Sequence, residues 1–273
     1  MAARRSRQNN IFQDDGSRVG IGSRGSQRER ARLFPTLREL ATDRKDMTVK
    51  QIVRKMPIVG PLAQSLWRSI RGGPATFNTS DYWEERYKSG GNSGRGSYDR
   101  LAAFKAEYLN DFVKQNEIQN VIEFGSGDGA QLRLAEYPAY IGVDVSQTIL
   151  QKTRRMFAGK PEYRFVHTSE LQPDTQCDLA LSLDVIFHLV EDEVFENYMT
   201  GLFNAGRRFV IIYSSNEELA PVAQHVRHRK FTNWVQANRP DFALAATVPN
   251  KYPFEESDRK NTSRADFFVF RRA

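Results

Sequence analysis

The chain has 273 residues, of which 40% are hydrophobic and 11% aromatic, enough to bury a sizeable core. No apolar run reaches the roughly 18 to 20 residues of a membrane-spanning helix, and the amino terminus lacks the apolar block of a secretory signal. The single cysteine, Cys177, excludes an internal disulfide. We therefore expect a cytoplasmic protein, either soluble or peripheral at the inner membrane surface.

The net charge of +7 is unevenly distributed. Residues 1–73 hold 16 Lys and Arg against 6 Asp and Glu, whereas the remaining 200 residues hold 24 against 27. Residues 1–30 have a polar composition typical of disordered chain, and residues 31–73 carry apolar residues at helical spacing among Lys and Arg. We predict a basic leader over 1–73, disordered and then amphipathic. Its helical part can pack on its own domain, lie on an anionic membrane, or dock on nucleic acid or another partner.

A folded domain is predicted over residues 74–273. Five short, nearly continuous apolar runs indicate buried strands at 120–124, 140–145, 163–167, 178–186 and 207–215. Helical patterns lie between them at 98–116, 131–135, 147–156 and 191–205. Such runs are typical of a parallel sheet that helices cover on both faces. Two more strands, 241–250 and 265–272, follow without a long helix between them, which indicates an antiparallel pair.

The stretch "VIEFGSGDGAQ", residues 121–131, predicts a strand, a glycine turn and a place for a nucleotide-like ligand. Gly125, Gly127 and Ala130 satisfy the dinucleotide-binding pattern G-x-G-x-x-G/A, and Asp144 lies where a ribose-binding acid is expected. That pattern alone leaves a nicotinamide cofactor open. Glu123, just before the turn, favours a ligand with positive charge over a pyrophosphate, and S-adenosylmethionine has a sulfonium, an ammonium and a ribose diol.

These motifs resemble those of the class I S-adenosylmethionine-dependent methyltransferases. "VIEFGSGDG" is similar to their first motif, "YIGVDVS" to their second and "LALSLDVIFHLVED" to their fourth-strand motif, and the likeness runs from about residue 79 to the end. The resemblance implies a Rossmann-like α/β sheet of seven strands, mostly parallel with one antiparallel strand. "DYWEERYKSGGNSGRGSYDRLAAFKAEYL", "HVRHRKFTNWV" and "VPNKYP" are also similar to a bacterial methyltransferase group associated with surface-polysaccharide biosynthesis.

The resemblance also implies roles for individual residues. The glycine turn would pass under the methionine part of the cofactor, and Asp144 would accept both ribose hydroxyls. The expected cofactor-binding residues are Tyr87, Glu123, Gly125, Ser126, Gly127, Asp144, Val145, Thr168, Ser169 and Asp184. The alternatives are that the glycines only make a tight turn and that Asp144 only caps the next helix. Asp128 is expected to be an exposed turn residue, and no metal is expected.

The glycines and serines of residues 89–97 lie between aromatic residues, as in a flexible lid. Methyl transfer must exclude water and align the acceptor, the methyl carbon and the sulfur, so a lid would be useful. Trp83 and Tyr87 could face the sulfonium with their rings. We expect residues 87–97 to become ordered when the cofactor binds. An ordinary surface loop is the alternative.

A hydroxyl acceptor requires removal of a proton, and imidazole titrates near neutrality. His188, or His225 and His228, are therefore the candidate general bases. Arg227 and Arg229 would bind an anionic acceptor, or would form a solvated basic loop.

The sequence thus predicts an enzyme that methylates an oxygen of a carbohydrate or related polar acceptor and releases S-adenosylhomocysteine. The alternatives are a nucleic-acid or small-molecule methyltransferase, and a non-catalytic regulator that binds S-adenosylmethionine. The folded part, with a net charge of −3, and the lack of an aromatic-basic module argue against nucleic acid. The sequence does not define the acceptor or the oligomeric state.

Overall fold

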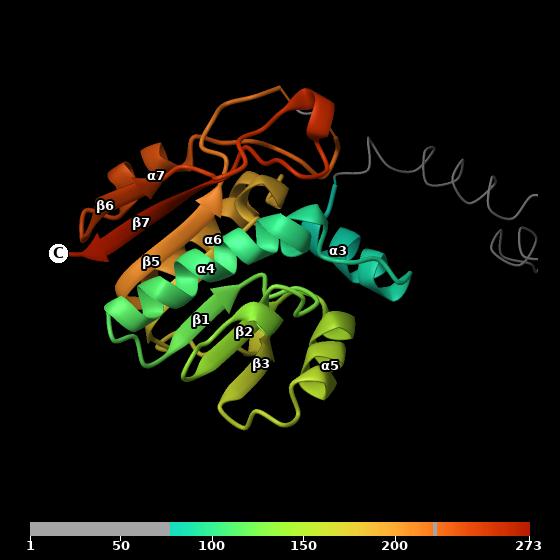
Figure 1. Ribbon diagram of the computed structural model, residues 1–273, viewed down its shortest axis with the longest axis vertical. Coiled ribbons are helices and arrows are strands. Elements are labelled where there is room, and N and C mark those ends of the chain that lie inside the picture. Colours follow the sequence, from blue (N-terminus) through green and yellow to red (C-terminus); the bar gives the residue numbers. More distant parts are fainter. Residues whose placement is uncertain (1–76, 221–222) are drawn as a thin grey trace, which may run out of the picture. The chain divides into compact units, whose positions relative to one another are not determined.

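A computed structural model describes residues 77–220 and 223–273 (Figure 1). The predicted leader, 1–73, lies outside the described residues, as do the membrane or partner contacts expected of it. Among the helices that the structure describes, none has the length and apolarity needed to cross a membrane.

Seven strands form one sheet in the order β3-β2-β1-β4-β5-β7-β6. Strands β1 to β5 are parallel, and β7 runs antiparallel to both of its neighbours, β5 and β6. This confirms the predicted α/β class and the single antiparallel strand. The strands are β1 (Val121–Phe124), β2 (Tyr140–Asp144), β3 (Tyr163–His167), β4 (Cys177–Leu183), β5 (Gly206–Ser214), β6 (Phe242–Val248) and β7 (Asp266–Arg272).

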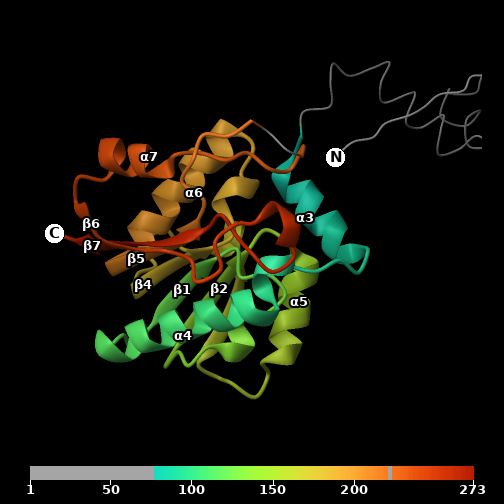
Figure 2. The ribbon, with the colours of Figure 1, turned by 45° about the horizontal axis from the view of Figure 1, so that its top comes forward.

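Helices pack on both faces of the sheet, as Figures 1 and 2 show. The described helices are α3 (Thr79–Lys88), which contacts α5, together with α4 (Asp99–Gln115), α5 (Gln147–Met156), α6 (Asp192–Ala205) and α7 (Phe231–Asn238). The predicted helix at 131–135 is only a 3-10 turn, Leu132–Leu134. Helices α3 and α7 were not predicted. The side chain of Asn78 accepts a hydrogen bond from the Asp81 amide and so caps α3. Asparagine at this position is a helix-start signal that the sequence analysis did not use.

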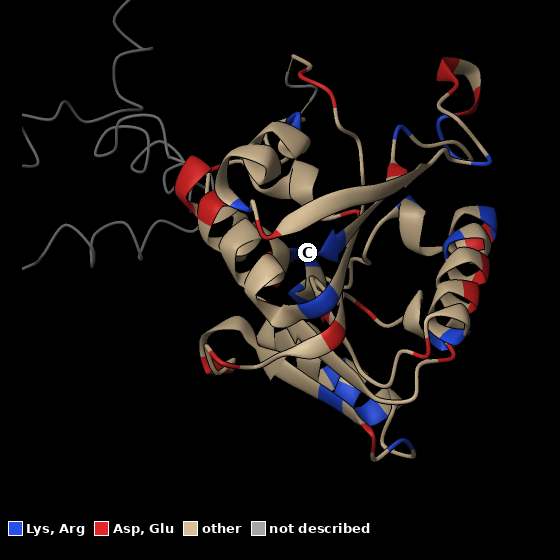
Figure 3. Cartoon of the chain, turned by 90° about the vertical axis from the view of Figure 1, so that its left-hand side faces the viewer, with Lys and Arg blue, Asp and Glu red and all other residues tan. Residues whose placement is uncertain are grey.

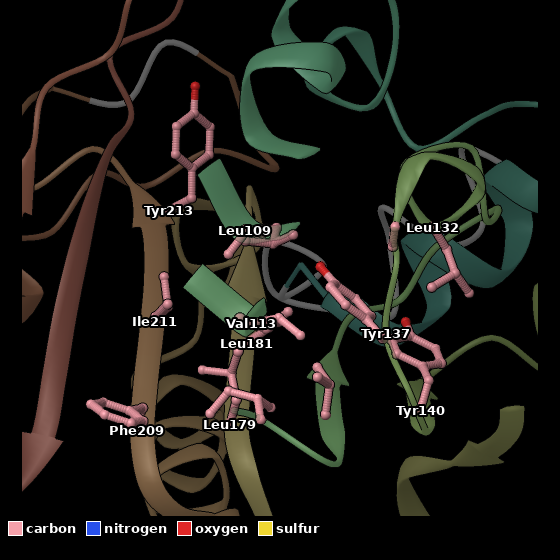
Figure 4. Close-up of a cluster of buried hydrophobic side chains, with 14 of the residues drawn as sticks. Leu109, Val113, Leu132, Tyr137, Tyr140, Leu179, Leu181, Phe209, Ile211 and Tyr213 are labelled. Carbon is pink, nitrogen blue, oxygen red and sulfur yellow. The ribbon is translucent and has the colours of Figure 1, made fainter. Parts of the chain in front are cut away.

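The alternation of side chains along the strands divides the core between the two faces. Leu179, Leu181 and Leu183 of β4 point to the face that α4 covers, where they join Leu109 and Val113 (Figure 4). Ala180, between them, points to the opposite face, which α6 and α7 cover with Phe195, Met199, Leu202, Phe203, Phe231 and Val235. Because both faces are buried, β4 is apolar almost throughout, as the sequence pattern indicated.

Leu179, which is fully buried at the centre of the sheet, tests this core. We expect Leu179→Ala to lower the free energy of unfolding by about 2–5 kcal/mol, because the substitution removes buried methyl groups and leaves a cavity. Leu244→Ala is the matched control, since Leu244 on the edge strand β6 is 51% exposed and should change stability by less than about 0.5 kcal/mol. Urea unfolding of the two variants measures the difference. Equal losses would contradict the assigned core.

Candidate active site

A cavity of about 560 Å³ lies at the carboxyl ends of β1, β2 and β4. The chain leaves β1 for β2 on one side and returns to β4 on the other, so the connections diverge at this point of the sheet. Open α/β sheets bind ligands at such switch points, and the volume suits a small molecule. Residues from α3, α4, the glycine turn, the end of β4 and α6 line the cavity.

The turn after β1 has no room for a side chain at two of its glycines, Gly125 and Gly127. Gly125 and Gly127 have φ angles of 77° and 59°, which favour glycine. A Cβ atom on Gly125 would lie 2.5 Å from Val185 Cγ2, and one on Gly127 would lie 2.3 Å from Ser93 Oγ. The turn is therefore compressed between the β4 loop and residues 89–97, and both glycines line the cavity.

Asp144 ends β2 and holds the turn in place. Its Oδ2 accepts a hydrogen bond from the Gly127 amide at 2.9 Å, and its Oδ1 accepts one from the Ser146 amide at 3.0 Å. Asp144 is only 6% exposed, and this burial raises its pKa. Helix α5 is capped by Ser146, whose Oγ accepts from the Ile149 amide, and not by Asp144. The Asp144 carboxylate thus faces the cavity beside the turn.

Glu123 lies on β1 and is also buried in the cavity wall. Its Oε2 accepts a hydrogen bond from the Tyr140 hydroxyl at 2.6 Å. Burial raises the pKa of Glu123 to about 7, although the Tyr140 hydrogen bond and nearby Lys105 act in the opposite direction. Near neutral pH, a positive charge in the cavity would therefore shift Glu123 toward its ionised form.

Residues 89–98 fold back onto the glycine turn through Asp128. The Ser93 amide donates to Asp128 Oδ2 at 2.9 Å, Ser93 Oγ accepts from the Asp128 amide at 2.8 Å, and the Tyr98 hydroxyl donates to Asp128 Oδ2 at 2.5 Å. Tyr87 adds a hydrogen bond between its hydroxyl and Ser93 Oγ at 3.1 Å. Asp128 is 4% exposed, so the expectation of an exposed turn residue was wrong. Local sequence did not reveal the distant segment that covers it.

Helix α3 lies over the cavity and is attached near its middle and at its first residue. Glu84 accepts hydrogen bonds from Ser146 Oγ at 2.5 Å and Thr148 Oγ1 at 2.8 Å, at the start of α5. Burial acts to raise the pKa of Glu84, but these hydrogen bonds outweigh it and lower the pKa to about 2. At the first residue of α3, Thr79 Oγ1 donates to Glu191 Oε2 at 2.5 Å. Trp83 and Tyr87 line the cavity as expected of a lid, and ordering on cofactor binding stays a prediction.

His188 is the histidine that the structure places in the cavity wall. Its Nδ1 lies 2.9 Å from the His225 carbonyl oxygen. Because a carbonyl oxygen can only accept, Nδ1 carries the hydrogen in neutral His188, and Nε2 has a free lone pair. Burial lowers the pKa of His188 to about 4, so the ring is neutral near pH 7.

The other two candidate bases do not line the cavity. The ring of His225 is stacked between Tyr82, with centroids 4.8 Å apart, and His188, with centroids 5.6 Å apart. His228 Nδ1 lies 2.6 Å from Ser215 Oγ. Burial lowers the pKa of both histidines. The structure thus separates His188 from the other two by its access to the cavity.

The two predicted substrate arginines also lie outside the cavity lining. Arg227 Nη1 and Arg229 Nη1 lie 3.0 Å and 2.7 Å from Asp192 Oδ1, at the start of α6. Both guanidinium groups also donate to the Val190 carbonyl oxygen. Here they hold the loop after β5 against α6.

Among the remaining predicted residues, Ser126, Val145, Thr168 and Asp184 line the cavity. Ser169 does not, and its Oγ lies 2.7 Å from His167 Nδ1. Sequence reasoning missed Lys105, which is 1% exposed and lines the cavity. Its Nζ lies 2.6 Å from Asp184 Oδ2. A lysine on the apolar face of a helical pattern was the available signal. Residues 77–220 and 223–273 contain no His, Cys, Asp and Glu cluster suited to a metal ion.

Comparisons with known proteins agree with this geometry. Residues 122–211 match the family model described as a methyltransferase domain. No curated protein sequence matches the chain.

Several solved structures share the fold. The N-methyltransferase NodS from Bradyrhizobium japonicum WM9, in complex with S-adenosylhomocysteine, has a TM-score of 0.57 at 13% identity, covering 72% of this chain and 99% of that one. The CurJ carbon methyltransferase has a TM-score of 0.51 at 12% identity, with coverages of 72% and 61%. The small RNA methyltransferase HEN1 has a TM-score of 0.50 at 16% identity, with coverages of 64% and 26%. Residues 122–211 therefore match a methyltransferase domain, and the described residues have the fold that these methyltransferase structures share.

Proposed function

We propose that this chain transfers the methyl group of S-adenosylmethionine to an oxygen of a carbohydrate or a related polar acceptor. The observation that carries the proposal is His188, a partly buried neutral imidazole in the cavity wall with one nitrogen fixed as donor and the other free to accept a proton. A base in that position is needed for a hydroxyl acceptor, whereas a pure cofactor-binding regulator needs none.

The chain's own residues fit the cofactor. Asp144 would accept the ribose hydroxyls with the lone pairs that the Gly127 and Ser146 amides leave free. Val145 and Thr168, which also line the cavity, would border the adenine. The glycine turn would lie against the methionine part, since Gly125 and Gly127 line the cavity. When bound, the cofactor supplies an activated methyl group on a sulfonium.

Transfer then needs alignment and one proton acceptor. The acceptor oxygen would form a bond to the methyl carbon as the carbon–sulfur bond breaks, and His188 Nε2 would accept the proton of the acceptor. S-adenosylhomocysteine and a methyl ether are the products. Helix α3, with Trp83 and Tyr87 in the lining, would exclude water from this step.

The nature of the acceptor rests on the sequence resemblance to enzymes of surface-polysaccharide biosynthesis. Lys, Arg, Asp and Glu are interspersed along the described ribbon, which does not favour a polyanion such as RNA (Figure 3). The contacts of Arg227 and Arg229 with Asp192 favour a neutral polar acceptor over an anionic one. Peripheral contact of the basic leader with the inner membrane belongs to the same proposal and rests on the leader's composition.

A labelling experiment tests the acceptor class. The protein is incubated with S-adenosylmethionine carrying a labelled methyl group and with separated glycans, lipids and RNA. We expect the label in the glycan fraction, in a base-stable ether. Label in RNA alone, retained after deletion of residues 1–73, would replace the proposal with a nucleic-acid methyltransferase.

Asp144→Asn tests the cofactor site. An amide oxygen cannot replace a carboxylate that takes several N–H and O–H donors, so affinity for S-adenosylhomocysteine should fall roughly 10- to 100-fold. Isothermal titration calorimetry measures the affinity, with Asp111→Asn on the exposed side of α4 as the matched control. Wild-type protein that binds NAD in place of S-adenosylhomocysteine would refute the assignment.

His188→Gln tests the base. With the labelled acceptor fraction and saturating cofactor, we expect turnover to fall at least about 100-fold, because proton transfer contributes on that order. Affinity for S-adenosylhomocysteine should stay within about threefold. His228→Gln, outside the cavity lining, should keep most of its turnover. Since a base acts only when unprotonated, wild-type turnover should decline only as the pH falls toward about 4. Equal losses in the two variants would count against His188.

The raised pKa of Glu123 leads us to expect that cofactor binding depends on pH. A cationic ligand favours the ionised carboxylate, so binding lowers the raised pKa of Glu123 and releases a proton. Affinity for S-adenosylmethionine should therefore rise with pH, by up to roughly tenfold per unit below about pH 7. S-adenosylhomocysteine, which lacks the sulfonium, should show a weaker dependence. Calorimetry between pH 6 and pH 8 measures both slopes. In Glu123→Gln the dependence should disappear, and a slope equal to that of the wild type would disprove its origin in Glu123.

A further inference from the structure

The cavity wall contains a buried amide oxygen without a partner. Gln131 follows the glycine turn and is 9% exposed. Its Nε2 donates to the Ala102 carbonyl oxygen on α4 at 3.1 Å. Because that oxygen can only accept, the contact fixes which end of the amide carries the hydrogens. The other end, Oε1, is buried and has no hydrogen-bond partner among the described residues. Buried acceptors of this kind are normally satisfied, so a ligand donor is expected here.

A buried cation with unused donors lies on the same helix, one turn further on. Lys105 follows Ala102 by three residues, so the two lie on the same side of α4. The Lys105 ammonium has three N–H donors, and its one hydrogen bond among the described residues goes to Asp184 Oδ2 at 2.6 Å. Its Nζ also lies 5.2 Å from the centre of the Tyr213 ring, a contact that uses no acceptor atom. Lys105 is 1% exposed and lines the cavity, as Gln131 does.

Gln131 Oε1, an acceptor without a partner among the described residues, and the Lys105 ammonium, a cation with free donors, both belong to side chains that line one cavity. Together they can recognise an α-amino acid. Such a group carries an ammonium, which needs acceptors, and a carboxylate, which needs donors. We infer that Lys105 and Gln131 bind the amino-acid end of the cofactor, Lys105 by donating to its carboxylate and Gln131 Oε1 by accepting from its ammonium. This inference rests on the proposed binding of S-adenosylmethionine in the cavity.

In this arrangement Lys105 of α4 and Gln131, after the glycine turn, bind the amino-acid end, or tail, of the cofactor. The ribose contact at Asp144 is separate. Lys105 also joins the tail to Asp184, which has a φ angle of 60° and sits against Gly96, where a Cβ atom would lie 2.3 Å from Asp184 Oδ2. Gly96 therefore covers the Asp184 end of the ion pair, and this part of the cofactor would be enclosed when bound.

Three nucleosides distinguish binding of the amino-acid end from binding of the rest of the cofactor. S-adenosylhomocysteine has the full tail, decarboxylated S-adenosylmethionine has the ammonium without the carboxylate, and methylthioadenosine has neither. Calorimetry with each ligand gives the contribution of each group. The variants are Lys105→Met and Gln131→Leu, which keep side-chain volume and remove the polar groups. Lys114→Met and Gln115→Leu, at exposed positions of α4, are the matched controls.

We expect both cavity variants to weaken S-adenosylhomocysteine binding roughly 10- to 100-fold, the range for a lost hydrogen bond to a charged group. Methylthioadenosine should bind them within about threefold of the wild type, which also shows that the variants are folded. Decarboxylated S-adenosylmethionine should be sensitive to Gln131→Leu and insensitive to Lys105→Met. Because Lys105→Met leaves Asp184 unpaired, Lys105→Met with Asp184→Asn is measured as well and should show the same ligand pattern.

Wild-type affinity of both variants for S-adenosylhomocysteine would overturn the inference and leave the proposed function intact. An equal loss for all three nucleosides would also overturn it, because the residues would then act on the shape of the site. A higher KM for the acceptor in Lys105→Met, with unchanged cofactor affinity, would reassign Lys105 to the acceptor. If the wild-type chain binds none of the nucleosides, the proposed function fails together with the inference.

Discussion

The hydrogen bond between the Asp144 carboxylate and the Gly127 amide is the constraint on which the site depends. It joins the end of β2 to the turn after β1, two neighbouring strands of the parallel sheet. The same carboxylate accepts a hydrogen bond from the amide of Ser146, the residue that caps α5. A buried carboxylate is costly unless it is hydrogen-bonded, and these two amides meet that requirement while leaving the remaining lone pairs free for a ligand.

The cover of the cavity is built from segments far apart in the chain. Glu84 attaches α3 to the start of α5, Thr79 attaches it to Glu191 before α6, and Ser93 joins the following loop to Asp128 in the glycine turn. Each contact ties the cover to an element that also shapes the cofactor site. The cover is therefore held in place by the same elements that shape the candidate cofactor site.

The charges around the cavity are arranged for a ligand that carries both signs. Asp184 is neutralised by Lys105, whereas burial raises the pKa of Glu123 and allows its charge to follow that of the ligand. His188, further along the wall, is kept neutral by burial and is oriented by the His225 carbonyl oxygen. In the proposed function, cation recognition, tail recognition and proton acceptance fall to different side chains, each with its environment set by a different element.

The sheet, its strands and the glycine turn could be predicted from the sequence, because continuous apolar runs and closely spaced glycines are local signals with few structural solutions. The sequence also singled out Asp144 and Glu123, since each adjoins such a signal, and both line the cavity. Only the tertiary structure separated His188 from His225 and His228, buried Asp128 under Ser93 and Tyr98, and brought Lys105 to Asp184. These outcomes depend on contacts between residues 30 to 80 positions apart, and the free energy of such contacts comes from burial and geometry that no local pattern encodes.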